Sequence, residues 1–435
     1  MSSTQDVTIT KAPEAEVRRV TLAGCVGIFV ELYDNGIFGF MAGVLAVVFF
    51  PDNTNGLILV FAGYAVSFVV RPLGAVVCGV LGDRFGRQRM LVFVIMLISV
   101  ATALIGMLPT YAAIGFAAPA LLILLRFAQG FSVGGEAAGA MTFLAEHALE
   151  GRRGRTTSYA QIASFLALLT GTLVAAGLTA GLGQAGMEEW GWRIPFLLAA
   201  PMGFIGWYIR SRISDTPNFS RLKAEGGLAK NPLREAFASR EHRKAMLLAL
   251  FLPLMNGSGY YVLFAYMPTF MKSSLGFTIV QGLLVTAVSL VAISIAIPYM
   301  GSLSDRIGRK KVMQGAAIAM AVAGIPCYAL IASGNLALAC IGAVVMAVIF
   351  AGHTGVIHIM IVELFPTRIR YSAYGLGYNI SSALFGGAAP LLMTWLIAET
   401  GSVYIPAIYA VVTALGTLAA LHTVTDRAHL PLRDA

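Results

Sequence analysis

The sequence predicts an all-α membrane protein of twelve transmembrane helices, arranged as two pseudo-symmetric six-helix bundles. The 435 residues are 58% hydrophobic and only 12% charged, against about 25% charged in a soluble domain, so much of the apolar surface must face lipid. A helix needs about 20 apolar residues to cross the hydrocarbon core. The twelve apolar runs are 20–50, 56–81, 90–108, 119–147, 156–182, 192–212, 245–271, 277–303, 312–332, 336–364, 373–398 and 403–423.

The basic residues predict the orientation of these helices. Lys and Arg collect in cytoplasmic loops, and with the amino terminus inside, 26 of the 30 basic residues fall on the cytoplasmic side. The exceptions are Arg71, Arg126, Arg193 and Lys272. We therefore expect both termini in the cytoplasm. The formal net charge of +9 is interpreted as orientation and contact with anionic lipids, and not as nucleic-acid binding.

A repeated loop divides the chain into two halves. Residues 79–89 read GVLGDRFGRQR, and residues 301–311, which lie 222 positions later, read GSLSDRIGRKK. Six helices separate the copies, so the halves have the same orientation and a pseudo-twofold axis along the membrane normal. We expect bundles at 1–212 and 245–435, joined by a polar, basic cytoplasmic linker at 213–244.

These two loops resemble the major facilitator superfamily, whose loops after the second and eighth helices carry this Gly-x3-Asp-Arg-x-Gly-Arg pattern. Further runs resemble its metabolite:proton symporter family, with proline/betaine transporters nearest. The resemblance covers nearly the whole chain and implies the major facilitator fold. The runs that carry it are RFAQGFSVGGE at 126–136, GWRIPF at 191–196, YMPTF at 266–270 and ELFPTRIRYS at 363–372.

The repeated loops supply candidate residues for a cytoplasmic gate. The aspartate of each copy can lie at the amino terminus of a neighbouring helix, where negative charge is favoured, and a following arginine can reach a glutamate at a helix end. The resemblance implies that such clusters latch the cytoplasmic side in the outward-open state. The alternative is that these residues are ordinary loop charges, which only fix the orientation of the helices in the membrane. The candidate gate residues are Asp83, Arg84, Arg87, Glu146, Asp305, Arg306, Arg309 and Glu363.

The first helix carries two acids inside the membrane. Glu31 and Asp34 are three residues apart and therefore lie on one face, and an acid at that depth costs about 2.5–3.5 kcal/mol. We interpret them as a proton-binding or substrate-binding pair in a central cavity. The alternative is permanent ion pairing with Arg71 or Arg126. The resembling family keeps both acids here, but its pattern ends in Phe where this chain has Asn35, so the substrate does not carry over directly.

The fourth helix adds a third acid to the proton-coupling candidates. Glu136 lies mid-membrane in the small-residue run 130–139, which lets helices approach closely. Arg126, ten residues earlier, and Gln129 match the superfamily's Arg-x-x-Gln-Gly element. The resemblance associates this element with proton coupling. The alternative is that Glu136 only pairs with a buried arginine and takes no part in proton coupling. The proton-coupling candidates are Glu31, Asp34, Glu136 and Arg126.

The second half offers the remaining candidates for a substrate pocket. Two glycines and a serine weaken the seventh helix at 256–266, whose tyrosines would suit a carboxylate or a quaternary ammonium. The 222-residue repeat offset places one of two histidines of the tenth helix at the position that corresponds to Glu136, and imidazole titrates near neutral pH. The alternative is that each histidine is buried with its hydrogen bonds satisfied and contacts neither proton nor substrate. The candidate substrate-binding residues are Tyr33, Arg71, Gln129, Gln161, Asn256, Tyr260, Tyr261, His353, His358, Tyr374, Tyr378 and Asn379.

Together these features predict a transporter and not an enzyme. The leading hypothesis is a monomeric, proton-coupled symporter in a bacterial inner membrane, importing a zwitterion such as proline or betaine, or a small carboxylate. A proton-coupled exporter of the same superfamily is the nearest alternative. An intramembrane enzyme is less favoured, because His353 and His358 project about 140° apart on a helix. The four cysteines lack metal-site spacing, and we expect neither metal nor cofactor.

Overall fold

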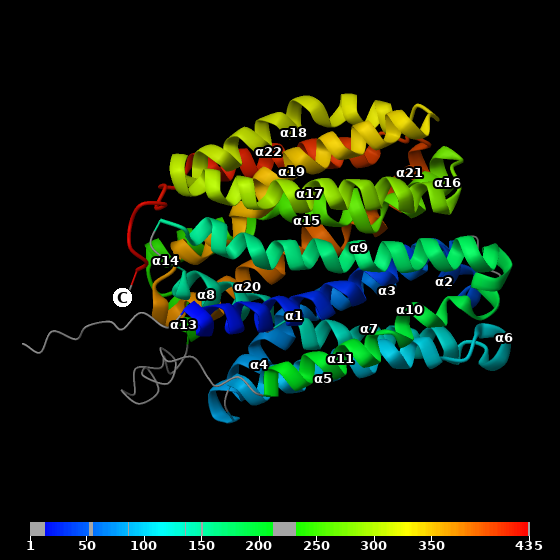
Figure 1. The fold of residues 1–435 in the computed structure, drawn as a ribbon, viewed down its shortest axis with the longest axis horizontal. Helices are drawn as coiled ribbons and strands as arrows, with labels where there is room; N and C mark the ends of the chain where they lie inside the picture. Colours follow the sequence, from blue (N-terminus) through cyan, green and yellow to red (C-terminus); the bar gives the residue numbers. More distant parts are fainter. Residues whose placement is uncertain are drawn as a thin grey trace, which may run out of the picture.

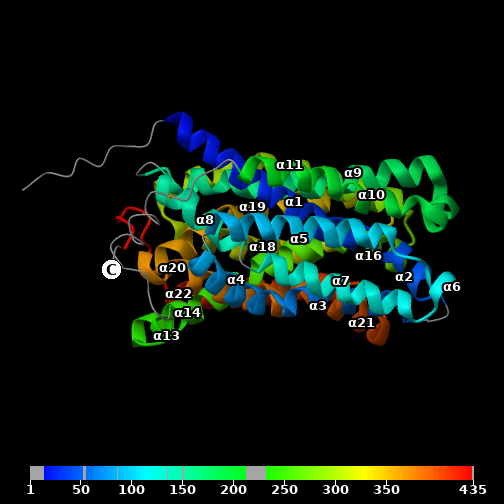
Figure 2. The same cartoon turned by 90° about the horizontal axis from the view of Figure 1, so that it is seen from below.

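The computed structural model describes residues 14–51, 55–85, 87–134, 136–148, 151–211 and 232–433. Within these ranges the regular structure is helical throughout, and the helices run roughly side by side along the longest axis of the molecule (Figures 1 and 2). Figure 1 shows the later helices α17, α18, α19 and α22 together on one side and the earlier helices α1, α3, α5, α7 and α11 on the other. The predicted all-α fold class is confirmed.

The described residues of the first half form eleven α-helices and one π-helical turn at Met187–Gly191. The α-helices are α1 (Glu14–Phe40), α2 (Ala42–Phe49), α3 (Gly56–Val69), α4 (Arg71–Phe85), α5 (Arg87–Met107), α6 (Tyr111–Ile114), α7 (Ala117–Val133), α8 (Glu136–His147), α9 (Arg153–Gly186), α10 (Arg193–Leu197) and α11 (Ala199–Ser211).

The second half continues the same way, with π-helical turns at Tyr261–Ala265 and Ser382–Gly387. Its α-helices are α13 (Pro232–Ala236), α14 (Arg240–Phe251), α15 (Leu254–Tyr260), α16 (Met267–Leu275), α17 (Ile279–Ile307), α18 (Arg309–Ile331), α19 (Leu336–Leu364), α20 (Thr367–Ser381), α21 (Ala389–Thr400) and α22 (Ile405–His422).

These helices account for every predicted transmembrane span. Among the described residues, eight helices are long and apolar enough to cross a membrane, and α1 with α2 forms a further span bent by 62°. Three shorter apolar helices, at Val92–Met107, Ala117–Val133 and Arg193–Ile209, fall within the remaining predicted spans. Within the predicted linker, α14 begins at Arg240, and the boundaries of the linker stay a prediction. The first part of that linker, 213–231, lies outside the described residues.

Several of the spans are interrupted within the described residues, and three of these breaks lie near the middle of the fourth, seventh and eleventh spans. The predicted weak point of the seventh helix is observed, since α15 ends at Tyr260 and a π-helical turn follows. The fourth span breaks between α7 and α8 at Gly134, and the eleventh contains the π-helical turn that begins at Ser382. Breaks inside a membrane are tolerated where the freed backbone groups find other partners or line a cavity.

Glycines bring α4 and α7 into backbone contact. A Cβ atom added at Gly74 would lie 1.9 Å from the carbonyl oxygen of Phe131. One added at Gly134 would lie 2.0 Å from the carbonyl oxygen of Arg71. A side chain at either position would therefore force the two helices apart, which confirms the close approach predicted for the small-residue run.

The two ends of the bundle differ in charge. One end, which we call the basic end, carries Arg152 and Arg155, the pair Lys310 and Lys311, and the last described residue, Arg433. Figure 1 shows the start of α1 and the carboxyl terminus at this end, whereas α2, α6 and α16 lie at the opposite end. The arrangement agrees with the predicted grouping of basic loops, and its orientation in a membrane stays a prediction.

Candidate functional site

A cavity of about 50 Å³ lies between the two halves, where the interrupted helices meet. Its walls come from α1, α4, α7, α8 and α9 of the first half and from α15, α19, α20 and two π-helical turns of the second. Eight of the predicted substrate-binding residues and the predicted acid Glu31 line it. These eight are Arg71, Gln161, Asn256, Tyr260, Tyr261, His358, Tyr378 and Asn379.

Four predicted substrate-binding residues lie outside the cavity lining. The hydroxyl of Tyr33 donates to the carbonyl of Pro195, 3.0 Å away, and therefore holds α1 to α10. Gln129 is engaged elsewhere in the first half. His353 is completely buried and stacks on Phe350, and neither of its ring nitrogens has a hydrogen-bond partner among the described residues.

The fourth of these, Tyr374, acts one layer behind the cavity wall. Its hydroxyl lies 2.6 Å from Nδ1 of His358, and His358 itself lines the cavity. The amide of Asn256 donates to the hydroxyl of Tyr378 at 3.1 Å. Oδ1 of Asn256 and the hydroxyl of Tyr260 are buried without a hydrogen bond in the described structure. Such atoms cost free energy unless a ligand or water satisfies them.

The wall from the first half presents opposite charges. Glu31 and Arg71 both line the cavity and are only 3% and 5% exposed. Arg71 donates through Nη2 to Oδ1 of Asn35 at 3.2 Å, and its guanidinium carbon lies 3.7 Å from the centre of the Phe68 ring. The amide of Asn35 donates in turn to the backbone carbonyl of Glu31 at 3.3 Å. Asn35, which sequence reasoning noted only as a departure from a family pattern, thus links α1 to the start of α4.

Asp34 occupies a different environment from Glu31, which corrects the prediction of one acidic pair. Its Oδ1 accepts hydrogen bonds from Thr102 at 2.6 Å and from Gln129 at 2.5 Å. Its Oδ2 lies 3.5 Å from Nη1 of Arg126. Asp34 does not line the cavity and is only 2% exposed, so it faces α5 and α7 inside the first half. Of the two arginines considered as partners for the acids, Asp34 pairs with Arg126.

Arg126 has several partners besides Asp34. It is fully buried, donating to Oε1 of Gln129 at 2.8 Å and to Oγ of Ser67 at 2.9 Å. Its guanidinium carbon also lies 4.2 Å from the centre of the Phe38 ring, in the range of a cation–π contact. Losing one partner of a buried ion pair costs about 3–5 kcal/mol. The remaining contacts of Arg126 reduce that cost if Asp34 loses its charge.

Several predicted residues cannot be placed in this detail. Glu136 begins α8, but its side chain lies outside the described residues. The same holds for the side chains of Asp83, Arg84 and Arg87, in the first copy of the repeated loop. Their roles stay predictions from the sequence.

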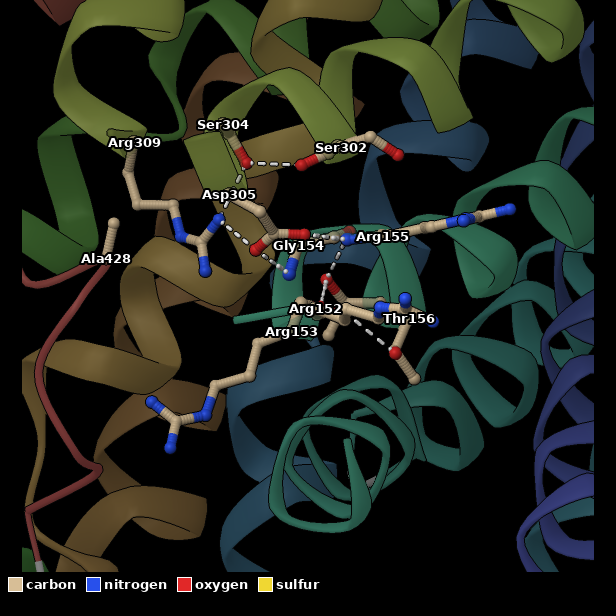
Figure 3. A network of polar contacts seen from close by, with 12 residues as sticks. Arg152, Arg153, Gly154, Arg155, Thr156, Ser302, Ser304, Asp305, Arg309 and Ala428 are labelled. Carbon is tan, nitrogen blue, oxygen red and sulfur yellow. Dashed lines mark hydrogen bonds and ion pairs between the residues drawn. The ribbon is translucent and has the colours of Figure 1, made fainter. Parts of the chain in front are cut away.

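The second copy of the loop has the geometry that the sequence predicts. Oδ1 and Oδ2 of Asp305 accept hydrogen bonds from the backbone amides of Gly154 and Arg155, each at 2.9 Å (Figure 3). These amides lie in the first turn of α9, where a negative charge is favoured. Arg309 bridges Asp305, at 2.7 Å, and Glu363, at 3.3 Å. Asp305 therefore joins the second half to the first at the basic end.

Two features of this end were not predicted. Glu146 pairs with Arg370 at 2.7 Å, across the two halves. The PTRIR run contains two arginines, and the sequence alone does not distinguish them.

Arg306, predicted as a gate residue, is exposed. The carbonyl oxygen of Leu430, in the segment that follows α22, accepts a hydrogen bond from Arg153 at 2.9 Å. Figure 3 shows this segment, marked by Ala428, on the side of Arg309.

A glycine crossing holds α9 and α17 together beside Asp305. A Cβ atom added at Gly301 would lie 2.8 Å from the carbonyl oxygen of Gly154. One added at Gly154 would lie 2.6 Å from Nη1 of Arg309. Gly301 begins the second copy of the repeated loop, but no sequence pattern indicated that it faces Gly154 across the halves.

At the cavity wall and from there toward the opposite end, aromatic rings join the halves. The rings of Phe61 and Tyr266 are 5.6 Å apart in an edge-to-face arrangement, and those of Phe68 and Tyr261 are 4.9 Å apart. Tyr64 lies 6.0 Å from Tyr261 in a similar arrangement. The two halves therefore contact each other on both sides of the cavity.

This fold and cavity define a multi-pass membrane transporter for small solutes. The sequence profile of the Major Facilitator Superfamily matches residues 24–293 and 255–434, and the chain belongs to this superfamily. It is 36% identical to the glycine betaine/proline/ectoine/pipecolic acid transporter OusA of Dickeya dadantii, over 99% of this chain and 87% of that protein. The ectoine/proline transporter ProP of Corynebacterium glutamicum is 35% identical, over 97% and 86%.

Solved structures support the fold. The proton:xylose symporter XylE bound to 6-bromo-6-deoxy-D-glucose superposes with a TM-score of 0.78 at 18% identity, covering 97% of this chain and 98% of that one. A partially occluded inward-open conformation of XylE from E. coli gives 0.75 at 18% identity, covering 95% and 98%. The intramembrane enzyme is excluded as an alternative, because the relatives at 35–36% identity are transporters.

Proposed function

We propose that this protein is a proton-coupled symporter that imports a small zwitterion, such as proline or betaine, across a bacterial inner membrane. The observation that carries the proposal is the cavity between the halves, which presents an arginine, a glutamate and tyrosine rings to one small space. The names of the relatives, which include proline, betaine and ectoine transporters, support the same class of solute.

The cavity suits both ends of a zwitterion. Arg71 is the cation for a solute carboxylate, and its Nε is buried without a hydrogen bond in the described structure. The rings of Tyr260, Tyr261 and Tyr378 and the carboxyl group of Glu31 suit a secondary or quaternary ammonium group. The unsatisfied Oδ1 of Asn256 can accept from an N–H donor, which proline has and betaine lacks. Asn256 would therefore favour proline over betaine.

Asp34 is the proposed proton site, separate from the solute. When Asp34 binds a proton its ion pair with Arg126 ends, and Arg126 keeps Gln129, Ser67 and the Phe38 ring as partners. Because α1 carries Asp34 on one side and the cavity-lining Glu31 three residues earlier, a shift of α1 moves the proton site and the cavity wall together. This shared helix is the proposed route of coupling.

The basic end is the proposed cytoplasmic side, with both termini there. In this orientation the contacts of Asp305, Arg309 and Glu363 hold the cytoplasmic side closed, and they must break for solute release. One chain supplies both walls of the cavity, so a monomer is sufficient for transport. An exporter of the same superfamily would use the same parts in the opposite direction.

Transport into liposomes tests the proposal. Purified protein should accumulate radiolabelled proline or betaine only when the outside is acidic, and Asp34→Asn should abolish accumulation while solute exchange continues, because exchange needs no net proton movement. Glu189→Gln, which removes an exposed carboxylate at the opposite end, should leave accumulation unchanged. Full accumulation by Asp34→Asn would refute the proton site, and accumulation driven only by the opposite gradient would favour the exporter.

A further inference from the structure

Asn379 has two contacts that belong to different parts of the transport cycle. It lies on α20 of the second half, is 4% exposed, and lines the cavity. Its Nδ2 donates to the backbone carbonyl of Gly134 in the first half, at 2.8 Å. One side chain is thus both part of the cavity wall and a bond across the halves.

The carbonyl of Gly134 is available because α7 ends there. The last carbonyls of a helix have no partner within the helix, and α7 ends at Val133, with α8 starting at Glu136. Gly134 is also fixed from behind, since a Cβ atom there would lie 2.0 Å from the carbonyl oxygen of Arg71. The side chain of Arg71 lines the same cavity. The junction therefore has a cavity-facing residue on each half, Arg71 on one and Asn379 on the other.

Beyond Gly134, α8 and α20 contact each other at further positions toward the basic end. Gly139 faces the ring of Tyr371, which would lie 3.0 Å from a Cβ atom at that glycine, and Arg370 pairs with Glu146 at 2.7 Å. Twelve residues separate Gly134 from Glu146 in the sequence, or about 18 Å along a helix. In this series of contacts only the one made by Asn379 reaches the cavity, so it is where a bound solute can act on the closed seam.

We propose that Asn379 is a positioning residue that couples occupation of the cavity to closure of the basic end. The inference rests on the proposed symport function, in which the contacts at the basic end break to release the solute. When the two halves come together, the Asn379 amide donates to the carbonyl of Gly134. A solute that contacts both Arg71 and Asn379 stabilises the same closed arrangement of the halves. When the basic end opens, the bond breaks and both polar groups hydrate. The simpler alternative is that Asn379 only binds the solute, as the sequence predicted.

Solvent access to the cavity from the basic end separates the two roles. The reporter is Ser382→Cys, a cavity-lining position, in a chain whose four cysteines are replaced by alanine. Its labelling by a membrane-impermeant maleimide is measured without solute, in vesicles of each orientation. Asn379→Leu should raise the labelling rate from the basic end by about tenfold, the effect of about one hydrogen bond. Asn379→Asp, which loses the amide donor and is nearly isosteric, should also raise it.

Asn256→Leu is the matched control. Asn256 lines the same cavity, but its amide donates to Tyr378 of its own half, so its loss should change labelling less than twofold while weakening solute binding. Unchanged labelling in both Asn379 variants, with weaker solute binding, would overturn the proposal and leave Asn379 as a binding residue only. The labelling assay uses neither solute nor a pH gradient, so its result does not depend on proton coupling. Failure of the symport mechanism would be detected in the liposome experiment instead.

Discussion

The seam between the halves is closed by different chemistry at its two ends. At the basic end, charges and backbone amides meet: Asp305 with the start of α9, Arg309 with Glu363, and Arg370 with Glu146. At the opposite end, aromatic rings pack against each other. Opening the basic end exposes groups that water solvates well, whereas opening the other end exposes apolar surface to water. We infer that salt acts mainly on the basic end, because its charge pairs are buried while the seam is closed and become exposed, and therefore screened, when the seam opens.

The largest effect is expected from a substitution that keeps the basic end from closing. Gly301→Leu would place a side chain where a Cβ atom alone lies 2.8 Å from the Gly154 carbonyl. Overpacking costs about 1–3 kcal/mol, which corresponds to a shift of about 5–150-fold in a two-state equilibrium. Liposome uptake should fall by a comparable factor.

The control for this variant is Gly315→Leu on α18. Gly315 has no heavy atom within 4 Å of its added Cβ position, so the larger side chain has room. Uptake by Gly315→Leu should match the unmodified protein. Equal uptake by the two leucine variants would show that the α9–α17 crossing does not limit closure.

A smaller effect is expected from Asp305→Asn. The change removes the negative charge at the start of α9 and the ion pair with Arg309, while the side chain keeps its size. A charge in a partly buried helix-terminus position contributes up to about 2 kcal/mol, so the population open at the basic end should rise by up to about 30-fold. Distances between spin labels on α8 and α20 would report this. A variant in which only solute affinity changes would contradict a gating role.

Weakening the aromatic end sharpens the comparison. Phe61→Leu keeps an apolar side chain but removes the edge-to-face contact with Tyr266, which is worth about 0.5–1.5 kcal/mol beyond area burial. The population open at the opposite end should rise by about two- to tenfold. This rise should be the same in low and high salt, whereas that of Asp305→Asn should depend on salt. Equal salt dependence of both variants would break the comparison.

The smallest effect is expected at the edge of the basic end. Arg433 pairs with Glu241 at 2.6 Å, but Glu241 is 66% exposed, and exposed pairs contribute about 0–1 kcal/mol. Arg433→Ala should therefore change uptake less than twofold. A loss as large as that of Asp305→Asn would mean that the segment after α22 takes part in the gate.

Much of the fold could be predicted because the bilayer imposes its length on each helix. The twelve spans, the weak seventh helix and the position of Asp305 at a helix start all follow from local sequence and the repeat. The separation of Asp34 from Glu31 could not be predicted, since spacing along α1 does not show how the helix is rotated against its neighbours. Arg370 was missed for a similar reason: a run with two arginines does not show which one reaches the other half.

The central claim is that the proton binds at Asp34 while the solute binds in the cavity beside Glu31 and Arg71. It is tested most directly by recording proton uptake, with a pH-sensitive dye inside liposomes, when proline or betaine is added outside. The unmodified protein should acidify the lumen as solute enters. Asp34→Asn should exchange solute across the membrane with no change in lumen pH. Solute-dependent acidification by Asp34→Asn at the level of the unmodified protein would contradict the account.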